Sequence, residues 1–396
     1  MTADDAPRVP FAQRWRRPMQ PRNPDDAHRT ATPLELFFDL VFVVALAQAA
    51  SGLHHAVADA HAVEGIVGYL LAFFGIWWAW MNFTWFASAY DVDDAPYRVL
   101  VFVQMTGALI FAAGVPALAE LDLTGAVAGY VVMRVALVVQ WIRAGRGDPE
   151  RRACAHRYAV GISAAQAGWV LLLFAPEGLV LPGFVALVVV ELLVPAWAEA
   201  RMRTPWHPHH IAERYGLMTI IVLGESVLAA TIAIQAALAG GEALVDVLPT
   251  IAGGLLILYS MWWIYFDRPV HDLLTSLRRA FVWGYGHYFV FAAAAAVGAG
   301  LAVSVDVATG HAAAGARAAG FAVAVPVAVY LLCLWVLHHR PRHDSATPEV
   351  FVPVTVVLVL LAALTPYAVP LVGLILAGTL ALEIVARHRL AVSGGA

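Results

Sequence analysis

The feature that most constrains this chain is its series of long apolar stretches. Residues 68–80 (GYLLAFFGIWWAW) and residues 354–382 (VTVVLVLLAALTPYAVPLVGLILAGTLAL) contain no charged side chain. Hydrophobic residues make up 61% of the chain and charged residues 13%, whereas a soluble domain is about half apolar and about a quarter charged. Stretches this long and uniform indicate helices that cross a bilayer. We therefore predict an all-α polytopic membrane protein that has the lipid bilayer as its surroundings.

About twelve segments come close to the length of about 20 mostly apolar residues that a membrane-crossing helix needs. They are residues 34–53, 66–87, 98–116, 124–143, 158–175, 181–198, 211–236, 248–266, 280–304, 313–338, 350–366 and 370–387.

The arginines predict the orientation, because cytoplasmic loops are enriched in Lys and Arg. With the N-terminus in the cytoplasm, the even-numbered connections should carry them. They do, with Arg98, Arg143, Arg146, Arg151, Arg152, Arg157, Arg201, Arg203, Arg214, Arg268, Arg278, Arg279, Arg340, Arg342, Arg387 and Arg389. On the opposite side only Arg317 occurs, and Arg134 lies inside a span. We expect a multi-pass protein of the cell inner membrane with both termini cytoplasmic.

The domain organisation follows from these spans. Residues 1–32, rich in Arg and Pro, are expected to form a disordered cytoplasmic arm, and they lack the short apolar core of a cleavable signal. A first six-helix half covers residues 33–200, a cytoplasmic linker covers 201–212, a second half covers 213–390, and 391–396 form a tail.

The two halves resemble each other in sequence. Residues 68–80 match 253–265 (GGLLILYSMWWIY), including paired tryptophans, and Glu191 in one half corresponds to Glu383 in the other. These matches indicate a duplication, with chance similarity of apolar helices as the alternative. Six spans per half would place both halves in parallel orientation, related by an axis along the membrane normal.

Two acids stand at the start of the first span, in TPLELFFDLVF. Glu35 and Asp39 are four residues apart and share one helical face. Glu35 is explained by the helix start, where an acid is favourable and Pro33 fits the first turn. Asp39 lies one turn deeper among apolar residues, so we expect it to face a polar partner or a polar pathway.

Arg134 is expected to pair or to line water, because a lone guanidinium in hydrocarbon costs several kcal/mol. Its candidate partners are Asp39, Glu191 and Glu225, of which the last two share its mid-span depth. Arg134 could form an ion pair between spans or bind a substrate. Glu225, beside small residues in VLGESVL, would favour its protonated form if unpaired and could exchange a proton near neutral pH.

Other polar residues have structural as well as functional interpretations. His287 could relay protons, although a hydrogen-bonded structural role is favoured. The loop acids Asp91, Asp93 and Asp94 could bind a divalent cation, or Asp94 could cap the helix that begins near Pro96. The histidines of WHPHHIAER (His207, His209 and His210) could bind metal, but solvated loop positions are favoured.

Three motifs together resemble the bacterial low-temperature-requirement protein A (LtrA) family. They are ELFFDLVFVVALAQ, FTWFASAYDVDD and HHIAERYGLMTIIVLGESVLAA, and the resemblance extends over about residues 30–388. The motif residues are Glu35, Asp39, Asp91, Asp93, Asp94, His210, Glu213, Arg214 and Glu225. The resemblance implies an integral membrane protein and leaves its activity and cofactors open.

The leading hypothesis is a proton-linked secondary transporter of a small solute or ion. Its pathway would be lined by Asp39, Arg134, Glu191, Glu225 and His287, with Glu225 protonatable and Arg134 as its counter-ion or an anion contact. The alternatives are a metal-dependent membrane enzyme acting on a lipid or isoprenoid through Asp91, Asp93 and Asp94, a sensor holding a hydrophobic ligand, and a structural partner of another membrane protein. The chain shows no catalytic or phosphate-binding motif and no basic, aromatic-interleaved surface for nucleic acid.

Overall fold

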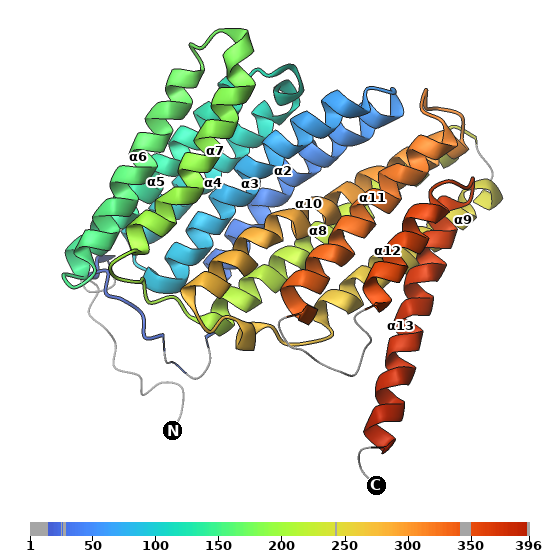
Figure 1. Ribbon diagram of the computed structural model, residues 1–396. Helices are drawn as coiled ribbons and strands as arrows, with labels where there is room; N and C mark the ends of the chain where they lie inside the picture. Colours follow the sequence, from blue (N-terminus) through green and yellow to red (C-terminus); the bar gives the residue numbers. More distant parts are fainter. Residues whose placement is uncertain (1–14, 25, 27–28, 242–243, 341–349, 394–396) are drawn as a thin grey trace. The chain divides into compact units, whose positions relative to one another are not determined.

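The computed structural model describes residues 15–24, 26, 29–241, 244–340 and 350–393, and its regular structure there is entirely helical (Figure 1). The long helices are α2 (Pro33–Ala58), α3 (Ala62–Tyr90), α4 (Ala95–Gly114), α5 (Thr124–Gly147), α6 (Arg152–Leu172), α7 (Glu177–Glu199), α8 (Pro208–Ala239), α9 (Leu244–Phe266), α10 (Leu277–Ala308), α11 (Ala316–Leu334), α12 (Phe351–Ala362) and α13 (Ala368–Ser393). Short helical turns η1 (Val115–Glu120), η2 (His271–Leu273) and η3 (Trp335–His339) extend or connect them.

Within the described ranges, ten helices are long and apolar enough to cross a membrane, rather than the twelve expected. The two predicted spans that fall short lie on α6 and α12. The first turns of α6 carry Arg152, His156 and Arg157, which lower its apolar character. α12 is short, with 12 residues.

Local sequence signals explain where several helices begin. Before α2, Thr32 and Glu35 form a reciprocal capping box, in which the Thr32 backbone N–H donates to the Glu35 carboxylate at 2.7 Å and the Glu35 N–H donates to the Thr32 hydroxyl at 3.3 Å. Asp94 caps α4 by accepting from the Tyr97 N–H at 2.8 Å, as predicted. Ser276 caps α10 in the same way.

The chain forms two compact units. The first comprises residues 1–45, 78–117 and 121–211, and the second comprises 46–77, 118–120 and 212–396. Their boundaries differ from those of the predicted sequence halves, because residues 46–77 belong to the second unit. The paired tryptophans of the apparent repeat also differ, since Trp78 is fully buried whereas Trp262 and Trp263 are about half exposed.

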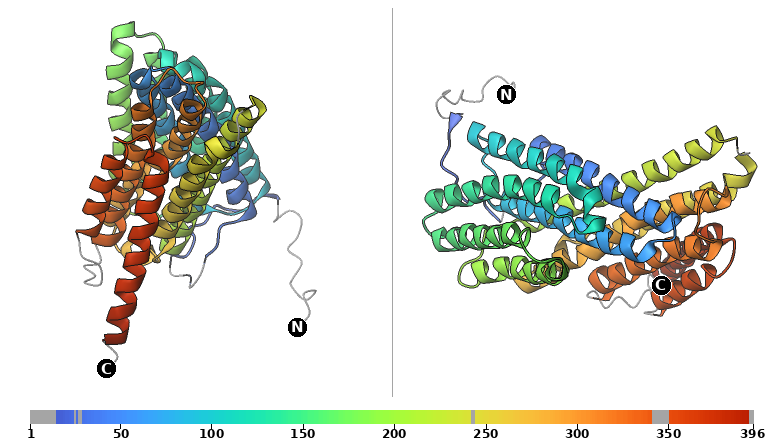
Figure 2. Two further views of the ribbon diagram at one scale, coloured as in Figure 1. Left: turned by 90° about the vertical axis from the view of Figure 1, so that its right-hand side faces the viewer. Right: turned by 90° about the horizontal axis from the view of Figure 1, so that it is seen from above.

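In the first unit, α4, α5, α6 and α7 pack in chain order, each against the next (Figures 1 and 2). The α4–α5 contact depends on small residues. A Cβ on Gly107 would lie 2.7 Å from the Met133 side chain and 2.8 Å from the Gly129 carbonyl oxygen. Such close backbone approach is typical of helix pairs in membranes.

In the second unit, α10 is the central helix. Its residues from Val290 to Val305 are all buried, as expected for a helix that is apolar on every side. It packs against α11 and α9, and α13 packs against α9 and α12.

The described part of the N-terminal arm packs against the first unit, which departs from the predicted disorder. Met19 is buried beside Gly147, and the backbone N–H groups of Arg17 and Arg22 donate to the Asp94 carboxylate and the Ala89 carbonyl. Residues 1–14, and 394–396 of the expected tail, lie outside the described residues.

Candidate functional site

The core of the first unit contains a buried carboxylate with three donors from three helices. Glu191 of α7 accepts from the indole N–H of Trp78 at 2.8 Å and from that of Trp169 at 3.2 Å. The Arg134 guanidinium on α5 approaches the same carboxylate at 3.4 Å. Arg134 and Glu191 were predicted as possible partners, but the two tryptophans were not foreseen at this site, because no spacing in the sequence marks them as donors.

Arg134 is 2% exposed, and Glu191 is 1% exposed. Of the three carboxylates predicted as its partner, Glu191 makes the ion pair. One turn earlier on α5, the Tyr130 hydroxyl accepts a hydrogen bond from the Arg134 Nη2, and its ring centroid lies 4.5 Å from the guanidinium carbon. The Arg134 Nε and Nη1 have no hydrogen-bond partner in the described part of the chain.

Asp39 faces a polar partner, as its position at the start of α2 suggested. It is fully buried, and its Oδ1 accepts from the indole N–H of Trp80 at 2.7 Å. Trp78 and Trp80 on α3 therefore serve two separate carboxylates. The tryptophan-rich sequence WWAW was the signal for these donors, and it was interpreted as a site for a hydrophobic ligand or as aromatic packing.

The family-motif residues of the first unit gather where α2 begins and α3 ends. The His210 Nε2 lies 3.1 Å from the Glu35 carboxylate, and both side chains are fully buried. His207 is 2% exposed, its N–H donates to the Ser88 hydroxyl at 3.0 Å, and its ring contacts the Asp26 carbonyl at 2.7 Å. The expectation of solvated histidines is therefore wrong for His207 and His210.

Arg29 joins this cluster from the arm. Its guanidinium donates to the carbonyl oxygens of Ala87, at 2.8 Å, and Ser88. These carbonyls belong to the last turn of α3, where the Ala87 carbonyl also accepts from the Asp91 N–H at 3.1 Å. A basic side chain there also complements the negative end of the helix.

The three loop acids are engaged within the protein. Asp94 accepts from Arg143 at 2.7 Å in addition to its capping role, and Asp93 pairs with Arg98 through two bonds of 2.7 and 2.8 Å. The Asp91 Oδ1 accepts from the Asp93 N–H at 3.0 Å. Within the described ranges, no group of three His, Cys, Asp or Glu side chains is placed to hold a metal ion. The alternative of a metal-dependent enzyme thus has no preformed ligand set in that part of the chain.

The pKa of the Asp91 carboxyl is higher than usual. Burial raises the pKa of its carboxyl to about 6, the nearby Glu35 carboxylate raises it further, and Arg29 partly opposes both. The cause is mainly the loss of water around the charged form.

Glu225 lies on α8 in the second unit and is 5% exposed. Its Oε2 is buried and makes no hydrogen bond within the described residues. The adjacent Ser226 donates to the Ala294 carbonyl of α10 at 2.9 Å, and a Cβ on Gly298 would lie 2.6 Å from the Ser226 Cα. α8 and α10 are thus in tight contact beside a carboxyl oxygen that has no hydrogen-bond partner among the described residues. Tyr69 of α3 lies close enough to interact with it electrostatically.

His287 on α10 makes structural hydrogen bonds at both ring nitrogens. Its Nδ1 lies 2.7 Å from the Trp283 carbonyl, and its Nε2 lies 3.1 Å from the Tyr265 hydroxyl. Since a carbonyl only accepts, Nδ1 carries the proton and Nε2 accepts from the tyrosine. The remaining motif residues, Glu213 and Arg214, lie in the second turn of α8, and Arg214 is fully buried.

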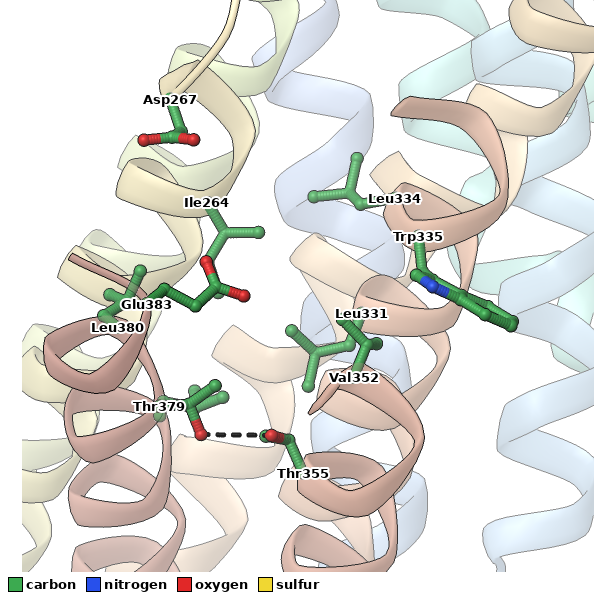
Figure 3. Close-up of a pocket in the computed structure, with 11 residues that line it drawn as sticks. Ile264, Asp267, Leu331, Leu334, Trp335, Val352, Thr355, Thr379, Leu380 and Glu383 are labelled. Carbon is green, nitrogen blue, oxygen red and sulfur yellow. Dashed lines mark hydrogen bonds between the residues drawn. The ribbon is translucent and has the colours of Figure 1, made fainter. Parts of the chain in front are cut away.

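A small pocket of about 30 Å³ lies between α9, α11, α12 and α13 of the second unit (Figure 3). Its polar lining consists of Asp267, Glu383 and the hydrogen-bonded pair Thr355 and Thr379, which are 3.0 Å apart. Arg387 bonds to Asp267 at 2.5 Å and to Glu383 at 3.4 Å. The (i, i+4) spacing of Glu383 and Arg387 was a signal for this pair.

The helices and the charged groups buried between them define the class of the protein as a polytopic helical membrane protein. The model of the family described as bacterial low temperature requirement A protein (LtrA) matches residues 30–386, and the chain belongs to that family. The predicted resemblance is thereby confirmed.

One curated relative is Uncharacterized protein RA0937 of Rhizobium meliloti (strain 1021), which is 32% identical over 277 residues. The match covers 64% of this chain and 64% of that protein, so it spans less than two thirds of the relative's length. No solved structure matches the chain.

Proposed function

We propose that this LtrA-family protein is a proton-linked secondary transporter of a small solute, with Glu225 as the group that takes up and releases the proton. The observation that carries the proposal is the buried Oε2 of Glu225, which lacks a hydrogen-bond partner among the described residues. A carboxylate in such surroundings is costly as an anion and must find a proton or a partner. Acids at this depth of a membrane protein mark ion or proton pathways.

The pathway also includes the buried charges of the first unit. Asp39 is held by Trp80, and Glu191 is held by Trp78, Trp169 and Arg134. Each acid keeps a defined donor, so its charge state can be controlled by whether that donor stays in place. His287 contributes as a fixed part of the helix core, because both of its nitrogens are already bonded.

This proposal includes twelve membrane crossings. It also includes a location in the cell inner membrane, with both termini in the cytoplasm. In support, each of the twelve predicted spans overlaps one long helix, and those at 158–175 and 350–366 overlap α6 and α12. The alternation of arginine-rich and arginine-free connections supports a crossing by both of these helices. Two halves of six crossings would then be related by duplication and would alternate access to a central path.

A proton-flux assay on purified protein in liposomes tests the proposal. A pH gradient is imposed, and an internal pH-sensitive dye reports proton entry for wild type, Glu225→Gln and the control Glu177→Gln. Glu177 is an exposed acid in the first turn of α7. We expect flux in wild type and in the control and its loss in Glu225→Gln. Equal flux in all three proteins would overturn the role of Glu225.

A further inference from the structure

The first unit holds a second set of buried polar atoms that lack hydrogen-bond partners. On α6, both the Oε1 and the Nε2 of Gln166 are unpartnered among the described residues, and the residue is 8% exposed. On α5, the Nε and Nη1 of Arg134 also have no hydrogen-bond partner among the described residues, and Arg134 is 2% exposed. Buried polar groups are nearly always hydrogen-bonded, so four such atoms on two helices that pack against each other call for an explanation.

The packing of α5 against α6 places these residues at one level. The Trp141 and Tyr158 rings stack at 4.1 Å, and the Tyr130 and Trp169 rings meet edge to face at 6.2 Å. The segment from Tyr130 to Trp141 on α5 therefore runs alongside the equally long segment from Trp169 back to Tyr158 on α6. In this antiparallel register, residue 134 lies opposite residue 165. Gln166 is therefore level with Arg134, and its (i, i+3) spacing from Trp169 puts it on the face that meets Glu191.

The hydrogen bonds already made set what a ligand must offer. Glu191 has three donors, from Trp78, Trp169 and Arg134. The atoms left over are N–H groups of Arg134, the amide N–H₂ of Gln166 and a single acceptor, the Gln166 Oε1. Because donors outnumber acceptors, the complementary ligand is rich in acceptor oxygens.

Charge balance sets the second requirement. Arg134 and Glu191 together are neutral, and the other groups bonded to this pair are Tyr130 from α5, Trp78 from α3 and Trp169 from α6, all of them uncharged. An anion added here would leave one net negative charge in a low-dielectric interior, which is strongly unfavourable. A proton taken up by Glu191 restores neutrality and releases Arg134 to bind the anion.

We infer that Arg134 and Gln166 form a binding site for a small monovalent oxyanion, and that one proton from solvent adds to the Glu191 carboxylate as the anion binds. The proton and the anion enter together, so the total charge of the site is unchanged. This inference rests on the proposed function where it identifies the anion as the transported solute.

Nitrate serves as the probe, with gluconate at the same ionic strength as the control for general salt effects. Binding is measured on purified full-length protein in detergent as the rise in the thermal unfolding midpoint with nitrate concentration. Proton uptake is measured in weak buffer with a pH indicator. We expect a saturable rise with nitrate, none with gluconate, and one proton taken up for each nitrate bound.

Three variants assign the binding to this site. Gln166→Leu should weaken nitrate affinity about tenfold, because it removes a hydrogen bond to a charged group, while the nitrate-free protein unfolds at an equal or higher temperature. Arg134→Gln with Glu191→Gln should abolish both the nitrate effect and proton uptake. The control Gln104→Leu removes a buried amide bonded to Gln140 at 2.9 Å, so it should lower stability and leave nitrate affinity unchanged.

The contrary results are distinct. No nitrate effect on wild type, or an equal effect on the Arg134 and Glu191 double variant, would overturn the site, and nitrate binding without proton uptake would overturn the role of Glu191. Because these are equilibrium measurements in detergent, they do not depend on transport. Proton flux in liposomes with no nitrate binding would therefore refute this inference alone, whereas nitrate binding without any flux would refute the proposed function.

Discussion

The indole N–H of Trp78 donates to the Glu191 carboxylate at 2.8 Å, which links α3 to α7 in the core of the first unit. Both side chains are almost completely buried, so the hydrogen bond is shielded from water. A hydrogen bond to a buried carboxylate is worth more than one between neutral groups, and its loss leaves an acceptor with fewer donors.

Trp78→Phe should lower the free energy of unfolding by about 1 to 3 kcal/mol, because it removes this donor while keeping an aromatic ring. The matched control is Trp263→Phe, at the corresponding position of the apparent repeat, where the side chain is 47% exposed. Denaturant unfolding in detergent, followed by circular dichroism, measures both. Equal destabilisation of the two variants would show that the Trp78 bond contributes nothing specific.

Arg134→Gln alone should cost about 3 to 5 kcal/mol, because it leaves Glu191 charged and without its counter-ion. Adding Glu191→Gln should recover most of that loss, since the double variant buries no charge. A double-mutant cycle of unfolding free energies gives the coupling between the two residues. Additive losses would contradict a direct ion pair.

Stability should depend on the protonation of Asp91, whose pKa burial raises to about 6 from an ordinary value of 3.8. The folded protein holds this proton more tightly than the unfolded chain does. Protonated Asp91 therefore contributes its full stabilisation of the fold below its ordinary pKa, and this stabilisation is lost as the pH rises through about 6. It amounts to up to about 3 kcal/mol.

The unfolding free energy of wild type should fall across this window more steeply than that of Asp91→Asn, which has no carboxyl to titrate. Asp93→Asn is the control, because Asp93 is half exposed and paired with Arg98. Unfolding curves at a series of pH values measure all three. Parallel pH dependence of wild type and Asp91→Asn would exclude Asp91 as the titrating group.

The crossing of α6 can be tested with single cysteines placed before and after it. Glu150→Cys lies in the connection before α6 and Gly178→Cys lies in the first turn of α7, both at exposed positions. The native Cys154 is buried, and the partly buried Cys333 is replaced by Ser in both variants. In intact cells, a membrane-impermeant maleimide should label Gly178→Cys and should label Glu150→Cys only after the membrane is permeabilised. Labelling of both positions in intact cells, or of neither, would show that α6 does not cross.

The sequence was sufficient for the class of fold and for features that depend on local spacing. The apolar segments predicted where each helix lies, and Asp94 with Pro96 predicted a helix start that the structure confirms. The expected number of crossings was less secure. Apolar character alone did not distinguish α6 and α12 from the ten helices that are long and apolar enough to cross a membrane. The first turns of α6 are polar, and α12 is short.

The candidate site could be predicted only in part, because it depends on how helices are rotated against one another. The sequence limited the partner of Arg134 to three carboxylates, but the choice of Glu191 required the packing of α5, α6 and α7. The tryptophan donors depend on the same rotations. His207 and His210 lie in a segment that the sequence marks as a linker, and their burial results from contacts with residues more than a hundred positions away, such as Ser88 and Glu35.

The most direct test of the central claim is the protonation of Glu225, followed by infrared difference spectroscopy as the pH of the membrane-reconstituted protein is changed. We expect a carboxylic-acid carbonyl band that disappears as the pH rises through the neutral range. It should be missing from Glu225→Gln and present in Asp91→Asn, which separates it from the titration of Asp91. Identical difference spectra for wild type and Glu225→Gln would show that Glu225 does not exchange a proton, and the proposed mechanism would be wrong.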